Sequence, residues 1–205
     1  MRPLGVRRED RFHPRTVGHV LGKAWSTAVI PVHVPLARPA IAAFRRADHV
    51  GITVTSLAEA LRFWVDVLGF RHVVKTHYEN SEFLEQVVGV DGADVTLAMV
   101  EGPDGSLVEL LEYHAPSERQ MMKPRSCDVG SVHLAYMVDN LDSLLAKVEA
   151  AGWLRLGAPQ TVSGGARDGL RIVYVRGQDG VTLEFLQAPI QANGHAAAWP
   201  NSLGA

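Results

Sequence analysis

The fold is decided by the stretch Ala47-Asp-His-Val-Gly-Ile-Thr-Val-Thr-Ser-Leu-Ala-Glu-Ala-Leu61 and by its partial copy, Ser131-Val-His-Leu-Ala-Tyr-Met-Val-Asp-Asn-Leu-Asp-Ser-Leu-Leu145. His49 falls on His133, and the offset of 84 residues holds without a gap through both stretches. Each stretch begins with apolar residues that alternate after the histidine, which predicts a strand, and continues with a helical pattern. The chain is therefore expected to contain two similar halves.

Both expected helices carry start and stop signals. Ser56, with Glu59 three residues later, has the capping-box pattern, and Asn140 is an equivalent N-cap. A glycine follows each helix, Gly69 in the first half and Gly152 in the second, where a left-handed C-cap costs little. The apolar residues of each helix fall on one face. They are Leu57, Leu61, Trp64, Val65 and Leu68 in the first half, and Leu141, Leu144, Leu145 and Val148 in the second.

The ends of the two halves also match. The first half ends in Asp104-Gly-Ser-Leu-Val-Glu-Leu-Leu-Glu112, and the second half ends in the similar segment Asp179-Gly-Val-Thr-Leu-Glu-Phe-Leu-Gln187. In each, an Asp-Gly pair predicts a tight hairpin turn that leads into a strand. Glu109 falls on Glu184 at an offset of 75, so the first half carries nine more residues, which we place in an insertion around Tyr78–Asp94. Each half therefore predicts a strand, a helix and about three antiparallel strands, the βαβββ order of an α+β protein.

The expected organisation of the 205 residues has five parts. These are an N-terminal extension (1–45), a first βαβββ module (46–116), a linker (117–130), a second βαβββ module (131–188) and a C-terminal tail (189–205). Within the extension, an extended segment near Ala28–Val34 is expected to dock on the domain or on a partner subunit.

The composition excludes several classes of function. A formal net charge of −2 provides no electrostatic attraction for nucleic acid or an anionic membrane. Cys127 is the only cysteine, so an internal disulfide and a cysteine-rich zinc site are both excluded, and this thiol is interpreted as packed or idle. No stretch approaches the roughly 18 apolar residues of a membrane span, and the N-terminus is a poor signal peptide. A cytoplasmic location is expected.

Four polar residues occupy matching places in the two halves. His49 and His133 lie in the opening strands, and Glu109 and Glu184 lie inside closing strands that are otherwise dominated by apolar residues. A carboxylate in such a strand is costly to bury unless it is paired or binds a metal. Two imidazoles and two carboxylates suit Zn²⁺, Ni²⁺, Co²⁺, Mn²⁺ or Fe²⁺. Because two-fold pseudo-symmetry would bring the four side chains to one axis, we predict one divalent ion per site, bound by these four residues.

The residues just beyond Glu109 are not assigned to this site. Glu112 is predicted to face solvent, as a lone strand glutamate usually does. Tyr113 and His114 follow the strand and are expected in a loop rather than among the ligands.

Weaker candidates lie in two other segments. His77 and Tyr78 belong to the insertion of the first half, which is interpreted as a wall of the substrate cleft. Arg167 and Arg171 flank a glycine-rich turn. They are either solvated hairpin residues or ligands that hold a substrate carboxylate or phosphate by bidentate hydrogen bonds.

The opening strands with His49 and His133 and the closing strands with Glu109 and Glu184 resemble those of the vicinal oxygen chelate superfamily. This superfamily includes glyoxalase I, methylmalonyl-CoA epimerase, extradiol dioxygenases and bleomycin- and fosfomycin-resistance proteins. The resemblance covers roughly residues 46–188 and implies two paired βαβββ modules whose curved sheets surround a metal-binding cleft. It maps the ligands onto His49, Glu109, His133 and Glu184. The set is similar to the two-histidine, two-glutamate site of bacterial glyoxalase I.

The resemblance implies a metal-dependent isomerase or lyase of the glyoxalase or epimerase type. Such an enzyme transfers a proton next to a metal-chelated carbonyl of a small molecule, with Glu184 or Glu109 as the base. The alternatives are an Fe(II)-dependent extradiol-type dioxygenase and a small-molecule binding or resistance protein. The expected partners are a small-molecule substrate with vicinal oxygens and a second copy of the chain, in a homodimer. Whether glutathione or coenzyme A takes part, and whether the site lies within one chain or across two, stays open at this stage.

Overall fold

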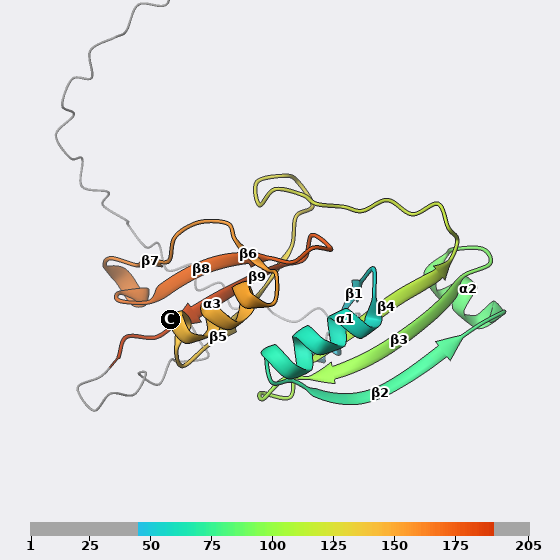
Figure 1. The fold of residues 1–205 in the computed structure, drawn as a ribbon, viewed down its shortest axis with the longest axis horizontal. Helices are drawn as coiled ribbons and strands as arrows, with labels where there is room; N and C mark the ends of the chain where they lie inside the picture. The colour runs from blue at the N-terminus through green and yellow to red at the C-terminus, as the bar shows by residue number, and fades with distance from the viewer. Residues whose placement is uncertain (1–44, 191–205) are drawn as a thin grey trace, which may run out of the picture. The chain divides into compact units, whose positions relative to one another are not determined.

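The computed structural model describes residues 45–190, and its strands form two separate sheets (Figure 1). The extended segment predicted near Ala28–Val34 lies outside the described residues, as does nearly all of the predicted tail. Within the described range, no helix is long and apolar enough to cross a lipid bilayer.

The first sheet has four strands in the order β1-β4-β3-β2. They are β1 (Val50–Thr53), β2 (Arg71–Tyr78), β3 (Asp94–Glu101) and β4 (Leu107–Ala115). β1 runs parallel to β4, whereas β3 pairs antiparallel with both β2 and β4. This arrangement places the first strand of the half directly beside the last strand.

The second sheet repeats this arrangement, with β5 parallel to β9 and with the order β5-β9-β8-β6. Its strands are β5 (His133–Met137), β6 (Leu154–Arg155), β7 (Gln160–Thr161), β8 (Arg171–Arg176) and β9 (Thr182–Gln187). The place of β2 is taken by two short strands, β6 and β7, which both pair with β8. The predicted α+β class with two βαβββ sheets is therefore confirmed.

The helices start where the sequence predicts. Ser56 is the N-cap of α1 (Leu57–Leu61), and its Oγ accepts a hydrogen bond from the backbone N of Glu59 at 3.3 Å. Asn140 is the N-cap of α3 (Leu141–Ala150), and its Oδ1 accepts from the backbone N of Ser143 at 2.9 Å. Each side chain satisfies one of the unpaired N–H groups of a first helical turn.

The first helix does not stay an α-helix. After α1 it continues as the π-helix η1 (Arg62–Val67), in which the backbone N of Leu68 donates to the carbonyl of Phe63 at 3.0 Å. A π turn holds one more residue than an α turn, and so it changes which side chains face the core. The consecutive rings of Phe63 and Trp64 are both buried. The apolar periodicity predicted a single regular helix here and did not reveal the wider turn.

The insertion of the first half contains a helix that the sequence did not reveal, α2 (Glu82–Val88), shown in green beside the sheet in Figure 1. Ser81 caps its N-terminus, and its buried Leu84 packs with Val95 of β3. Leu111 of β4 packs against the same small cluster. Because alternate strand residues share a face, α2 covers one end of the sheet face that carries Glu109.

The opposite face of the first sheet is packed on the core. Ala98 and Val100 of β3 and Val108 and Leu110 of β4 are fully buried in the larger apolar cluster, which also contains residues of α1. The same cluster includes residues of the second half, among them Leu183 and Phe185 of β9. In both closing strands the glutamate therefore lies between two core residues and points to the other face of its sheet.

Candidate metal centre

The first predicted pair forms within the first sheet. His49 directly precedes β1, and its Nε2 lies 3.4 Å from Oε2 of Glu109 on the adjacent strand β4. The parallel register, in which Gly51 lies opposite Glu109, brings the two side chains together. The side chains of His49 and Glu109 are 37% and 20% exposed, so both are held in place yet open to solvent or a ligand.

A carboxylate orients the first histidine. Nδ1 of His49 lies 3.1 Å from Oδ2 of Asp48, and Arg46 pairs with the other Asp48 oxygen at 2.8 Å. The hydrogen bond from His49, and then the charge of Arg46, lower the pKa of Asp48 below its usual value of 3.8. Histidines that bind metals commonly donate their second ring N–H to a carboxylate in this way, which leaves the other nitrogen free for the ion.

The second predicted pair has the same construction. His133 is the first residue of β5, and its Nε2 lies 3.2 Å from Oε2 of Glu184 on the parallel neighbour β9. The register again places the glutamate opposite the residue two positions after the histidine, here Ala135. The hydroxyl of Tyr174, on β8, lies 3.2 Å from the same His133 nitrogen. Burial, and then the charge of Glu184, raise the pKa of Tyr174.

Each pair suits half of a metal centre. Ligand atoms bound at roughly 2.1 Å to one ion, at right angles to each other, lie roughly 3 Å apart. The observed nitrogen–oxygen distances of 3.4 Å and 3.2 Å are close to that separation. An imidazole with a carboxylate is also a suitable donor set for a divalent transition metal.

The two pairs do not join into one cluster within this chain. Between residues 45 and 190, one group of three or more His, Cys, Asp or Glu residues has ligand atoms within 4.8 Å of one another, and it consists of His77, Asp94 and His114. In a single chain the four predicted ligands therefore form two half-sites, one on each sheet.

Both half-sites lie at a sheet edge. β1 and β5 each end the strand order of their sheet, and most of their residues are exposed. Val50 of β1 is 40% exposed and Met137 of β5 is 48% exposed. Exposed edge strands with apolar side chains are surfaces that proteins usually cover.

Two capping residues were missed by the sequence analysis. Oε2 of Glu112 accepts a hydrogen bond from the backbone N of Leu57 at 2.8 Å, at the start of α1. Oε1 of Gln187 accepts from the backbone N of Leu141 at 2.9 Å, at the start of α3. The prediction that Glu112 faces solvent was wrong, because the third residue after Glu109 lies on the helix-covered face. The signal was present, since Glu112 and Gln187 differ by the same 75 positions as Glu109 and Glu184.

Other weaker candidates have different places from those expected. Tyr113 and His114 lie inside β4 rather than in a loop. Arg171 makes a bidentate pair with Asp142, at 2.9 Å and 2.8 Å, so its guanidinium is already occupied by a carboxylate of this chain. Cys127 is exposed rather than packed.

The chain also contains a cavity of about 600 Å³. Phe63, Trp64 and Trp153 contribute aromatic surface to it, and Asp179 contributes a carboxylate that accepts a hydrogen bond from the backbone N of Thr55 at 3.2 Å. No residue of either His–Glu pair lines this cavity. The cavity is thus a separate feature from the two half-sites.

Comparison with known proteins identifies relatives for most of the described chain. The family model described as "Glyoxalase/Bleomycin resistance protein/Dioxygenase superfamily" matches residues 48–174. A 2-epi-5-epi-valiolone epimerase from Actinomyces sp is 34% identical over 149 residues, which cover 70% of this chain and 80% of the relative.

Two solved structures share the fold. A glyoxalase family protein from Bacillus cereus superposes with a TM-score of 0.63 at 24% identity, over 72% of this chain and 97% of that one. A glyoxalase I variant from Zea mays superposes with a TM-score of 0.50 at 18% identity, over 70% of this chain and 46% of that one.

Proposed function

This chain belongs to the glyoxalase/bleomycin resistance protein/dioxygenase superfamily, and from that premise we propose that it is a metal-dependent epimerase. The observation that carries the proposal is the pair of matching half-sites, His49 with Glu109 and His133 with Glu184. The 34% identity to an epimerase favours an inversion at carbon over the other reactions of the superfamily. The substrate class proposed is a small ketone, because the name of that relative's substrate, 2-epi-5-epi-valiolone, has the ending of a ketone.

The metal centre of the proposed enzyme is completed by a second copy of the chain. His49 and Glu109 of one copy would meet His133 and Glu184 of the other, since the two half-sites do not converge within one chain. Both half-sites lie at exposed edge strands, β1 and β5, so a two-fold contact between these edges would cover apolar surface and join the ligands. The four ligands predicted from the repeat would then form two metal sites in each homodimer.

A divalent ion held by these residues supplies Lewis-acid stabilisation of the negative charge that grows on the carbonyl oxygen of the substrate. The two glutamates have the proton-transfer role. One carboxylate removes the proton from the carbon next to the carbonyl, and the electron pair of the broken C–H bond moves toward the carbonyl oxygen. A proton returned to the opposite face of that carbon restores the C–H bond with inverted configuration. No oxidant or reductant is consumed.

Two carboxylates from different sheets are a suitable arrangement for inversion. Epimerisation requires that one group takes the proton from one face and another group delivers a proton to the other face. Glu109 and Glu184 come from equivalent positions on β4 and β9, so the contact proposed above would place them on different sides of a shared site. Tyr174, beside His133, adds a hydroxyl that can orient the substrate.

The chemical step is tested by following solvent deuterium. The wild-type protein is incubated in D₂O with small ketones, 2-epi-5-epi-valiolone among them, and deuterium at the inverted carbon is measured by NMR. We expect deuterium exchange in the wild type. In Glu184→Gln the exchange rate should fall by a factor on the order of 10²–10⁴, the usual contribution of a positioned general base. The control Glu118→Gln changes an exposed glutamate outside both half-sites and should leave the rate unchanged. Full activity of Glu184→Gln, or turnover that consumes O₂, would reject the epimerase and favour a dioxygenase.

The shared site is tested by mixing two variants that each lack one of the two half-sites. One variant carries His49→Ala with Glu109→Gln, and the other carries His133→Ala with Glu184→Gln. If sites form between copies, a mixed dimer has one site with all four ligands intact and one with none. An equal mixture should therefore bind more metal than either variant alone. The gain should be about one quarter of the metal that the wild type binds through these four ligands, since about half of the dimers are mixed and each has one intact site of two. Sites built within one chain would give no gain on mixing.

A further inference from the structure

The geometry points to a second metal site in this protein, formed by His77, Asp94 and His114 on the face of the first sheet opposite to Glu109. One ligand atom of each residue lies within 4.8 Å of the others. The site would bind a divalent transition metal of the Zn²⁺, Co²⁺ or Ni²⁺ kind.

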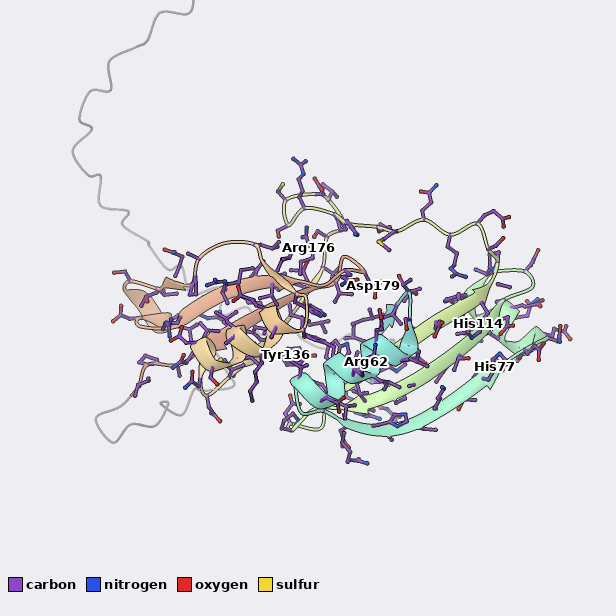
Figure 2. All side chains as sticks on the ribbon, viewed as in Figure 1. Arg62, His77, His114, Tyr136, Arg176 and Asp179 are labelled. Atoms are coloured by element: carbon purple, nitrogen blue, oxygen red, sulfur yellow. The ribbon has the colours of Figure 1, made fainter. Side chains whose placement is uncertain are left out.

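The three ligands come from three adjacent strands. His77 is near the end of β2, Asp94 begins β3, and His114 is near the end of β4. Nε2 of His77 lies 2.6 Å from Oδ1 of Asp94, and the rings of His77 and His114 are 5.6 Å apart and nearly perpendicular. Figure 2 shows the two histidines near each other on the first sheet. The strand pairing, rather than a flexible loop, sets these positions.

A neighbouring hydroxyl orients one of the ligands. Oγ1 of Thr96 lies 2.8 Å from Nε2 of His114, and Thr96 is only 9% exposed. Thr96 is paired with His77 in the register of β2 and β3, so it lies at the centre of the cluster. Such a partner fixes the orientation of the imidazole, as the groups around bound metals commonly do.

This cluster is separate from the half-site of the same sheet. Along β4, Glu109 contacts His49, whereas Glu112 reaches the start of α1. His114 is two residues after Glu112, and alternate strand residues share a face, so His114 lies on the α1 side of the sheet. Binding at the cluster and binding at Glu109 therefore involve opposite faces and different ligands.

The donor set selects the class of ion. Two imidazoles and one carboxylate suit borderline transition metals, whereas Mg²⁺ and Ca²⁺ prefer oxygen ligands. The His77 side chain is 48% exposed and the Asp94 side chain 27%, so an ion can enter from solvent, and water can complete its coordination. At present the 2.6 Å contact is a hydrogen bond between His77 and Asp94, and an ion would replace the shared proton.

The position of the cluster indicates what a bound ion does. His77 and Asp94 lie at the two ends of the insertion that contains α2. An ion bound by both residues and by His114 would tie the two ends of this insertion to each other and to β4. Since α2 covers one end of the Glu109 face, the ion would stabilise a wall next to the half-site without entering it.

The experiment counts ions in tag-free, full-length protein after equilibration with micromolar Zn²⁺ and removal of free metal. In a His49→Ala/His133→Ala background, which disables the half-sites, we expect about one Zn²⁺ per chain to remain, as three protein ligands can bind one ion. Adding His77→Ala and His114→Ala should remove that ion. The control His72→Ala changes an exposed histidine on the same strand, outside the cluster, and should retain it.

Two milder substitutions keep the test decisive if the alanine variants fold poorly. Asp94→Asn preserves the shape of the side chain but removes the charged ligand, and it should abolish stoichiometric binding. Thr96→Val removes the hydroxyl beside His114 and should weaken Zn²⁺ affinity about tenfold, the lower end of the usual effect of such a partner. Zn²⁺ should also raise the melting temperature of the His49→Ala/His133→Ala protein but not that of the same protein with Asp94→Asn.

The results distinguish this site from the proposed enzyme. An ion that survives in the half-site variant but is lost with Asp94→Asn supports the second site, whatever the catalytic activity. The proposal of a second site would be overturned if the half-site variant bound the same amount of zinc, with the same affinity, with and without Asp94→Asn.

Discussion

Replacing Gln187 by alanine should destabilise the protein through the start of α3. The Gln187 side chain is 3% exposed, and its Oε1 accepts a 2.9 Å hydrogen bond from the backbone N of Leu141, where α3 begins. The same oxygen lies 3.3 Å from Nη1 of Arg171. Alanine would leave the Leu141 N–H buried without this acceptor, and helix N-termini rely on such acceptors.

The magnitude follows from two losses. A buried donor left unsatisfied costs about 1–3 kcal/mol. Loss of the buried methylene of the side chain adds about 0.8 kcal/mol. We therefore expect Gln187→Ala to lower the free energy of unfolding by about 2–4 kcal/mol, and a domain of this size would lose about 4–16 °C in melting temperature.

Urea unfolding followed by circular dichroism, at one fixed protein concentration, measures this effect. Gln187→Glu restores the arrangement of the first half, where Glu112 accepts from Leu57, and it should be much less damaging than alanine. The control Gln86→Ala removes an exposed glutamine of α2 and should change stability by less than about 0.5 kcal/mol. A change below about 0.5 kcal/mol in Gln187→Ala would refute the reasoning that this side chain anchors the helix.

Two further predictions follow from the electrostatics. Asp48→Asn should weaken binding of a divalent ion at the His49–Glu109 half-site about tenfold, because Asp48 orients His49. A competition titration with a coloured chelator measures this affinity, and an unchanged affinity would contradict the role of Asp48. The hydrogen bonds from Arg171 lower the pKa of Asp142 below its usual value of 3.8. The Arg171–Asp142 pair therefore stabilises the folded protein fully above pH 3.8, and this contribution is lost as the pH falls through the lowered pKa. Asp142→Asn should therefore be less stable than wild type at pH 7, and the difference in urea midpoint should shrink toward pH 2; a difference that is constant with pH would exclude this pair as its source.

The repeat made most of the fold predictable. Capping residues and Asp-Gly turns act through their immediate neighbours, and so Ser56, Asn140 and the hairpin at Asp104 could be read from local sequence. The matched positions of His49 and Glu109, and of His133 and Glu184, also predicted which residues approach each other within each half.

Local patterns were less informative where packing chooses between conformations. The π-helix that follows α1 carries the apolar residues expected of a regular helix, and the wider turn depends on how Phe63 and Trp64 fill the core. The face of Glu112 was misread because the strand was considered alone, without the helix whose first N–H group it meets. Arg171 was expected either in solvent or on a ligand, because its partner Asp142 lies on α3, far away in the sequence.

The amino-acid sequence by itself determined the repeated strand–helix order, the helix starts and the histidine and glutamate of each half-site, because these depend on short-range periodicity and on an internal duplication. Only the tertiary structure decided that the two half-sites remain apart within one chain, and that His77, Asp94 and His114 meet. Those three residues have no repeated spacing and come from strands whose alignment is set by sheet register. Register depends on the packing of whole faces, so it brings together side chains that no local pattern connects.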